Sequence, residues 1–141
     1  MKNELGEIAA AKGRCEEFLD QRGVPMKAGR QLLVVLDELL NNIISYAYPE
    51  PGAHEIGVTV AVLKNQVRVT VQDDGVPFNP LARRVPDTDA SLGDRELGGL
   101  GIHLVRNMLD DVHYERRGSR NVLTLVRTLK QIPDSSKPTP D

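Results

Sequence analysis

The stretch KAGRQLLVVLDELLNNIISYA, residues 27–47, sets the fold because its apolar side chains recur every three or four residues. This period predicts a long amphipathic helix. Its apolar side consists of Leu32, Leu33, Leu36, Leu39, Leu40, Ile43 and Ile44. The prolines at positions 49 and 51 end the helix. Apolar residues then alternate over 56–62 and 67–71, which predicts two strands joined by a hairpin turn at residues 64–66.

The same patterns extend the prediction in both directions along the chain. They predict a first helix over 4–20, a third over about 99–110, and strands near 112–116 and 121–129. Between them, residues 74–97 show no sustained period and contain three prolines, so we expect a long loop. Segregated helices and consecutive hairpins favour an α+β fold, a two-layer α/β sandwich with helices on one face of a mixed, mostly antiparallel sheet.

Length and composition limit the class of protein. The 141 residues predict a single domain over 1–130, and the proline-rich polar residues 131–141 are expected to form a disordered tail. A net charge of −2 argues against direct binding to nucleic acid, and no apolar run is long enough to span a membrane. One cysteine excludes an internal disulfide framework. With no signal-peptide pattern at its start, the chain is expected to be cytoplasmic.

Two polar residues interrupt the apolar pattern of the long helix. Glu38 and Asn42 are four residues apart, so their side chains lie side by side on the helix. A carboxylate beside an amide oxygen can accept a proton and can ligate Mg²⁺, which prefers oxygen ligands. The alternative is a polar flank that faces solvent. Asp37 and Asn41 have the same spacing and compete for either assignment.

Two glycine-containing segments follow the strands. Asp73 ends the second strand and precedes Asp74-Gly75, so its carboxylate could accept a hydrogen bond from the adenine amine, although an Asp-Gly turn alone is common. Gly98, Gly99 and Gly101 stand before the third helix, where exposed N–H groups and the helix dipole suit phosphates. In the last strand, Thr124 could add a hydroxyl near the base, or could be only a strand former. Together these segments predict a pocket for Mg·ATP.

This combination resembles the ATP-binding domain of the GHKL superfamily, which includes histidine kinases, gyrase-type ATPases and anti-sigma-factor kinases. Residues 36–48 resemble its N box, 73–77 its G1 box and 99–101 its G2 box, with a mobile lid over the nucleotide between the last two. The size and compact spacing are most similar to the anti-sigma-factor serine/threonine kinases of the RsbW type.

The resemblance implies a role for each matching residue. Glu38 would be the general base and Asn42 the Mg²⁺ ligand, while Asp73 would contact adenine. The nucleotide site would also include Gly75, Gly99, Leu100 and Gly101.

The resemblance further implies a transcription regulator that binds a sigma factor, phosphorylates a STAS-type anti-sigma antagonist and forms a homodimer. A nucleotide-sensing module that binds a partner without phosphotransfer remains the alternative. The catalytic half of a histidine kinase would need a phosphoacceptor His, and the first helix has none. A gyrase-type ATPase would need a further transducer domain.

Overall fold

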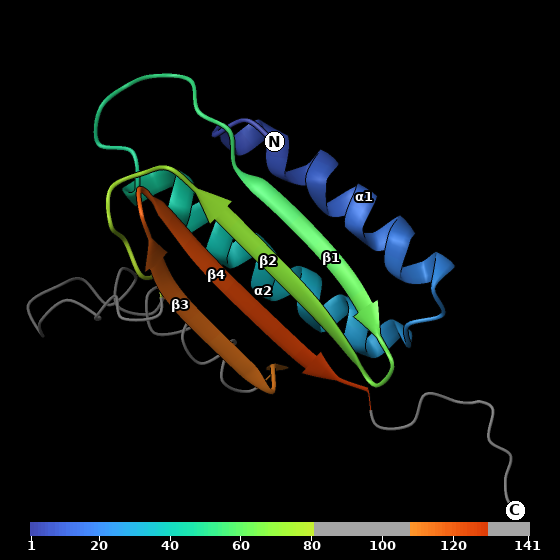
Figure 1. Ribbon diagram of the computed structural model, residues 1–141. Helices are drawn as coiled ribbons and strands as arrows, with labels where there is room; N and C mark the ends of the chain where they lie inside the picture. The colour runs from blue at the N-terminus through green and yellow to red at the C-terminus, as the bar shows by residue number, and fades with distance from the viewer. Residues whose placement is uncertain (81–107, 130–141) are drawn as a thin grey trace, which may run out of the picture.

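The computed structural model describes residues 1–80 and 108–129 (Figure 1). Its elements are a 3-10 turn Leu5–Glu7, α1 (Ile8–Gln21), α2 (Met26–Tyr46), β1 (Gly57–Leu63), β2 (Gln66–Asp73), β3 (Asp111–Arg117) and β4 (Arg120–Thr128). Each agrees with a predicted helix or strand to within a few residues. The predicted loop after residue 80, most of the third helix and the tail 131–141 lie outside the described residues.

The four strands form one sheet in the order β1-β2-β4-β3. All three pairings among the described strands are antiparallel, in agreement with the mostly antiparallel sheet expected from the sequence. The register of β2 with β4 places Asp73 opposite Asn121 and Thr70 opposite Thr124. Just before β1, Lys2 forms an isolated antiparallel bridge with Glu55, and the Met1 ammonium donates to the carbonyl of Ile56 at 2.8 Å.

Both helices cover the same face of the sheet, with α1 beside α2 (Figure 1). The buried stripe of α2 includes Leu32, Leu36 and Leu40, which pack in one core with the inward side chains of the strands. In β2 and β4 those inward residues are Val67, Val69, Val71, Leu123 and Leu125. Burying each large aliphatic side chain contributes roughly 1.5–3 kcal/mol, so this core fixes α2 on the sheet.

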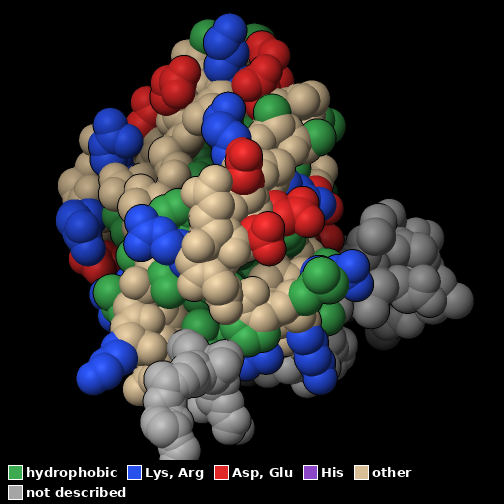
Figure 2. Space-filling model, turned by 90° about the vertical axis from the view of Figure 1, so that its right-hand side faces the viewer, with side chains coloured by type: hydrophobic (Ala, Val, Ile, Leu, Met, Phe, Trp, Pro, Cys, Tyr) green, Lys and Arg blue, Asp and Glu red, His purple; other side chains and the backbone are tan. Residues whose placement is uncertain are grey.

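The surface carries charges of both signs. Figure 2 shows acidic and basic side chains interspersed on one side of the molecule. Of the helices that the structure describes, none is long and apolar enough to cross a membrane.

Candidate active site

The structure separates the two competing polar pairs of α2. The Asp37 carboxylate faces α1, where it lies 3.4 Å from the Lys12 ammonium. Asn41 donates its amide to the Asp37 carbonyl at 2.8 Å, one turn back along the same helix. Asp37 and Asn41 therefore belong to the flank of α2 that meets α1.

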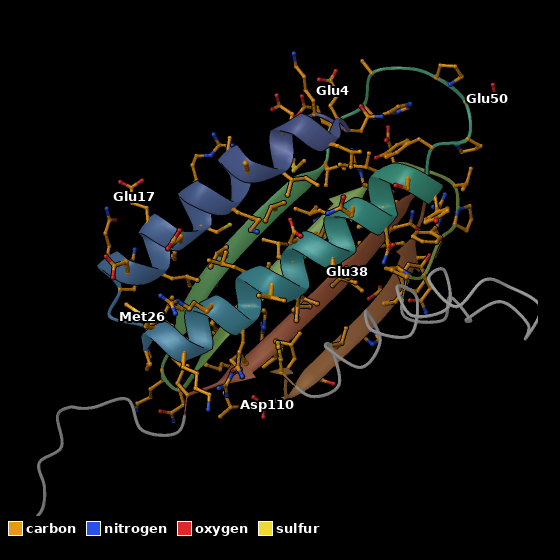
Figure 3. All side chains as sticks on the ribbon, turned by 180° about the vertical axis from the view of Figure 1, so that it is seen from behind. Glu4, Glu17, Met26, Glu38, Glu50 and Asp110 are labelled. Atoms are coloured by element: carbon orange, nitrogen blue, oxygen red, sulfur yellow. The ribbon has the colours of Figure 1, made fainter. Side chains whose placement is uncertain are left out.

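Glu38 and Asn42 belong to another flank of α2. Successive residues of an α-helix are rotated by about 100°, so Glu38 points away from the direction of Asp37 and nearly along that of Gln31, seven residues earlier. Gln31 accepts a hydrogen bond from Arg127 of β4 at 3.1 Å, which orients this flank toward the β4 side of the sheet. Both Glu38 and Asn42 are partly exposed there, and Figure 3 shows Glu38 near the middle of α2.

Asp73 ends β2 as a buried carboxylate with an exposed fraction of only 1%. Its Oδ1 accepts two hydrogen bonds, from the Gly75 N–H and from Asn121 Nδ2, each at 2.8 Å. Burying a charged group is costly unless it is hydrogen-bonded, and these two donors meet that need. Asp73 is therefore an enclosed acceptor at the end of β2.

The turn after Asp73 packs directly on the C-terminal end of α2. The Val76 N–H donates to the Ala47 carbonyl at 2.9 Å. A Cβ on Gly75 would lie 2.8 Å from the Ala47 Cβ and closer still to the Ala47 carbonyl oxygen, so only glycine fits this contact. With a rise of 1.5 Å per residue, Asn42 lies about 8 Å and Glu38 about 14 Å back along α2 from Ala47. Glu38, Asn42 and the turn after Asp73 therefore follow one another along the length of α2.

Aromatic and charged groups fix the segment that follows α2. The rings of Tyr48 and His54 stack with centroids 4.6 Å apart, and His54 Nδ1 lies 3.1 Å from Asp74 Oδ1. Burial raises the pKa of Tyr48 well above its usual range, and the negative charges of Asp73 and Asp74 raise it further. The Tyr48 hydroxyl is enclosed with no well-formed hydrogen bond among the described residues, although the Asp74 backbone lies close enough to lower its pKa slightly. This cluster ties residues 48–54 to the turn that follows Asp73.

The family model for the histidine kinase-like ATPase domain matches residues 1–127. The chain belongs to this family. The Bordetella bronchiseptica serine/threonine-protein kinase BtrW is 33% identical over 104 residues, which cover 74% of this chain and 72% of BtrW. The serine-protein kinase RsbW of Listeria monocytogenes is 26% identical over 120 residues, covering 82% of this chain and 76% of RsbW.

Solved structures agree on the fold. The blue-light activated histidine kinase of Erythrobacter litoralis superposes with a TM-score of 0.54 at 22% identity, covering 77% of this chain and 32% of that one. The relatives confirm the expected enzyme class, a protein serine/threonine kinase, and membership of the ATPase family implies the use of ATP.

Not every residue predicted for the site lies near Asp73 in this histidine kinase-like ATPase domain. Gly99, Leu100 and Gly101 fall outside the described residues. Thr124 is paired with Thr70 and His113, and it lies three residues along β4 from Asn121, the partner of Asp73. Side chains alternate between the two faces of a sheet, so Thr124 lies on the face opposite Asp73. The structure therefore does not bring the Thr124 hydroxyl to the candidate base site.

Asn121 is the site residue that the sequence analysis missed. It is 3% exposed, and its amide hydrogen-bonds to Asp73 on the helix-covered face of the sheet. A signal was present, because asparagine is depleted in strands and Asn121 begins a mostly apolar run.

The donor set suits Mg·ATP. Asn42 and Glu38 offer an amide oxygen and a carboxylate one turn apart, and Mg²⁺ takes few protein ligands beside waters and phosphate oxygens. Within residues 1–80 and 108–129, no three His, Cys, Asp or Glu side chains gather into a metal cluster. Glu38 and Asn42 could ligate a Mg²⁺ ion that takes its remaining ligands from waters and nucleotide phosphates.

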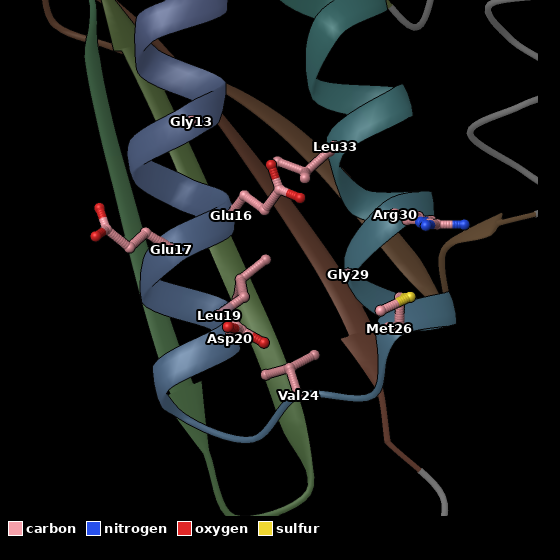
Figure 4. A pocket seen from close by; sticks show the side chains of 10 residues that line it. All are labelled: Gly13, Glu16, Glu17, Leu19, Asp20, Val24, Met26, Gly29, Arg30 and Leu33. Carbon is pink, nitrogen blue, oxygen red and sulfur yellow. The ribbon is translucent and has the colours of Figure 1, made fainter.

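A separate groove of about 620 Å³ lies between α1 and the N-terminal half of α2 (Figure 4). Acidic residues Glu16, Glu17 and Asp20 stand beside the apolar side chains of Leu19 and Leu33. None of the candidate site residues lines this groove, so it is distinct from the site around Asp73.

Proposed function

We propose that the chain binds Mg·ATP along α2 and transfers the γ-phosphoryl group to a serine or threonine hydroxyl of a partner protein. One observation carries the proposal: the Gly75–Val76 turn packs on Ala47 at the end of α2. This contact holds the turn after Asp73 at the C-terminal end of α2, the helix that carries Asn42 and Glu38.

Each residue has a distinct task in this proposal. Asp73 accepts a hydrogen bond from the adenine amine, and Asn42 supplies an oxygen ligand for Mg²⁺. Glu38 takes the proton of the attacking hydroxyl as the new O–P bond forms and the bond to the leaving ADP oxygen breaks. Bound Mg²⁺ would neutralise negative charge on the phosphates. Gly75, Gly99, Leu100 and Gly101 line the nucleotide site, as the family resemblance implies.

We also propose the partners that the RsbW-type resemblance implies. The phosphorylated protein is a STAS-type anti-sigma antagonist, the regulated protein is a sigma factor, and the kinase acts as a homodimer. The similarity to the serine-protein kinase RsbW of Listeria monocytogenes supports this proposal.

The test combines nucleotide binding with phosphotransfer. Calorimetric titration of Mg·ATP into Asp73→Asn should show affinity at least several-fold weaker than that of the original chain. With a STAS-domain protein encoded in the same genome as acceptor, Glu38→Gln should retain ATP binding and lose about 10²–10⁴-fold in transfer rate.

Asp37→Asn is the matched control, because Asp37 is the neighbouring carboxylate on the flank that faces α1. It should retain both binding and transfer. Equal transfer by Glu38→Gln would remove Glu38 from the role of base. ATP binding without transfer to any such acceptor would favour a nucleotide-sensing module, and no ATP binding would reject the proposal.

A further inference from the structure

The amide of Asn121 is fully used by its surroundings. Its Oδ1 accepts hydrogen bonds from the Phe78 N–H at 3.2 Å, the Tyr114 hydroxyl at 2.5 Å and Arg116 Nη1 at 3.2 Å. Its Nδ2 donates to Asp73 Oδ1 at 2.8 Å and to the Val76 carbonyl at 2.9 Å. A buried side chain with every donor and acceptor engaged has one defined position.

This network also fixes which way the amide points. Turning it over would set its oxygen against the oxygens of Asp73 and Val76, and its NH₂ group against two groups that can only donate, the Phe78 N–H and Arg116 Nη1. Four of the five hydrogen bonds would be lost, since only the Tyr114 hydroxyl can also accept, and each buried group left unpaired is costly. Asn121 therefore always presents its N–H to Asp73.

The consequence for Asp73 is that its Oδ1 is held as a hydrogen-bond acceptor. Its Oδ1 receives two N–H donors, from Asn121 and Gly75. Both donors require an acceptor there, and they hold the carboxylate plane in place. Arg116 supports the same turn by donating to the Gly75 carbonyl at 2.9 Å.

We infer that Asn121 is the positioning residue that makes Asp73 select a purine with a 6-amino group, such as adenine. The inference rests on the proposed function, in which Asp73 contacts the base. An amino group at position 6 donates to the second oxygen of Asp73. Guanine carries a carbonyl there, and its oxygen would meet an acceptor while no N–H of Asn121 is free to turn toward it.

The test compares two nucleotides on the same preparation. ATP and purine riboside triphosphate differ by the 6-amino group alone, so the ratio of their dissociation constants reports the contact made through Asp73. The original chain should bind ATP about 10-fold more tightly than the analogue, which is the difference expected for one charge-assisted hydrogen bond in a buried site. Asn121→Ala should bring this ratio close to one, and Asn121→Thr, which keeps one donor, should retain part of it.

Thr124→Val is the matched control, because Thr124 lies on the same strand and on the opposite face of the sheet. Its ratio should equal that of the original chain. The ratio is insensitive to a loss of folded protein, since a smaller active fraction affects both nucleotides alike.

A ratio unchanged in Asn121→Ala would overturn the inference, whether both affinities stay the same or both fall equally, and an equal fall is the sign of a purely structural role. Either result would leave the proposed ATP binding intact. Failure of the original chain to bind ATP would reject the proposed function and, with it, this inference.

Discussion

Gly75→Ala should destabilise the protein and weaken nucleotide binding together. The added methyl group would lie 2.8 Å from the Ala47 Cβ and closer to the Ala47 carbonyl oxygen, and neither atom belongs to a flexible side chain. Overpacking of this kind costs about 1–3 kcal/mol, and displacing the 2.9 Å bond from the Val76 N–H to Ala47 adds about 0.5–1.5 kcal/mol. The sum of these costs, roughly 2–4 kcal/mol, corresponds to a fall in Tm on the order of 10 °C.

The assay is thermal unfolding followed by circular dichroism, with Mg·ATP titrated below the transition. Gly13→Ala is the control, because a Cβ there meets nothing within 4 Å and Gly13 lies inside α1. It should stabilise the protein by up to about 1 kcal/mol, since alanine favours an exposed helix interior. If Gly75→Ala melts within about 2 °C of the original chain, the close approach of the turn to α2 does not hold the site.

Three further substitutions test the core and the titrating groups. Leu40→Ala, at a fully buried position, should lower the free energy of unfolding in urea by roughly 2–5 kcal/mol. Burial raises the pKa of the Cys15 thiol, so at alkaline pH the thiol ionises in the unfolded chain before it does in the folded one. The unfolded state then binds fewer protons, and stability should fall as pH rises above the ordinary thiol pKa, less steeply in Cys15→Ala. Asp74→Asn removes a negative charge near Tyr48 and should lower the Tyr48 pKa in a spectrophotometric titration, while burial still keeps it above normal.

The periodic elements could be predicted because burial on one side imposes a period that the sequence displays. The helix predicted over 27–47 is α2, Met26–Tyr46, and the strands predicted over 56–62 and 67–71 are β1 and β2. The period does not show which flank of α2 a neighbouring helix covers. The pair Asp37–Lys12 decides that, and it joins two helices whose relative placement depends on the tertiary core.

The sequence analysis named Thr124 for the site and missed Asn121 for a similar reason. The sequence itself shows that alternation within β4 separates Thr124 from Leu123 and Leu125. The sequence does not show on which face of the sheet Asp73 lies. The pairing of Asp73 with Asn121 joins residues 48 positions apart, and nothing local in either strand encodes that register.

The turn after Asp73 is held from three directions, and this explains why the site needs the whole sheet. The carbonyl of Ala47, at the end of α2, accepts from the Val76 N–H. Asn121 of β4 donates to the Asp73 carboxylate and to the Val76 carbonyl. Arg116 of β3 donates to the Gly75 carbonyl. The turn itself has few buried apolar side chains, so these polar anchors define its shape. A helix alone could place Glu38 and Asn42 one turn apart. Only the β3-β4 hairpin, packed beside β2, can fix the direction in which Asp73 accepts a hydrogen bond, so base recognition depends on a hairpin that is distant in the sequence.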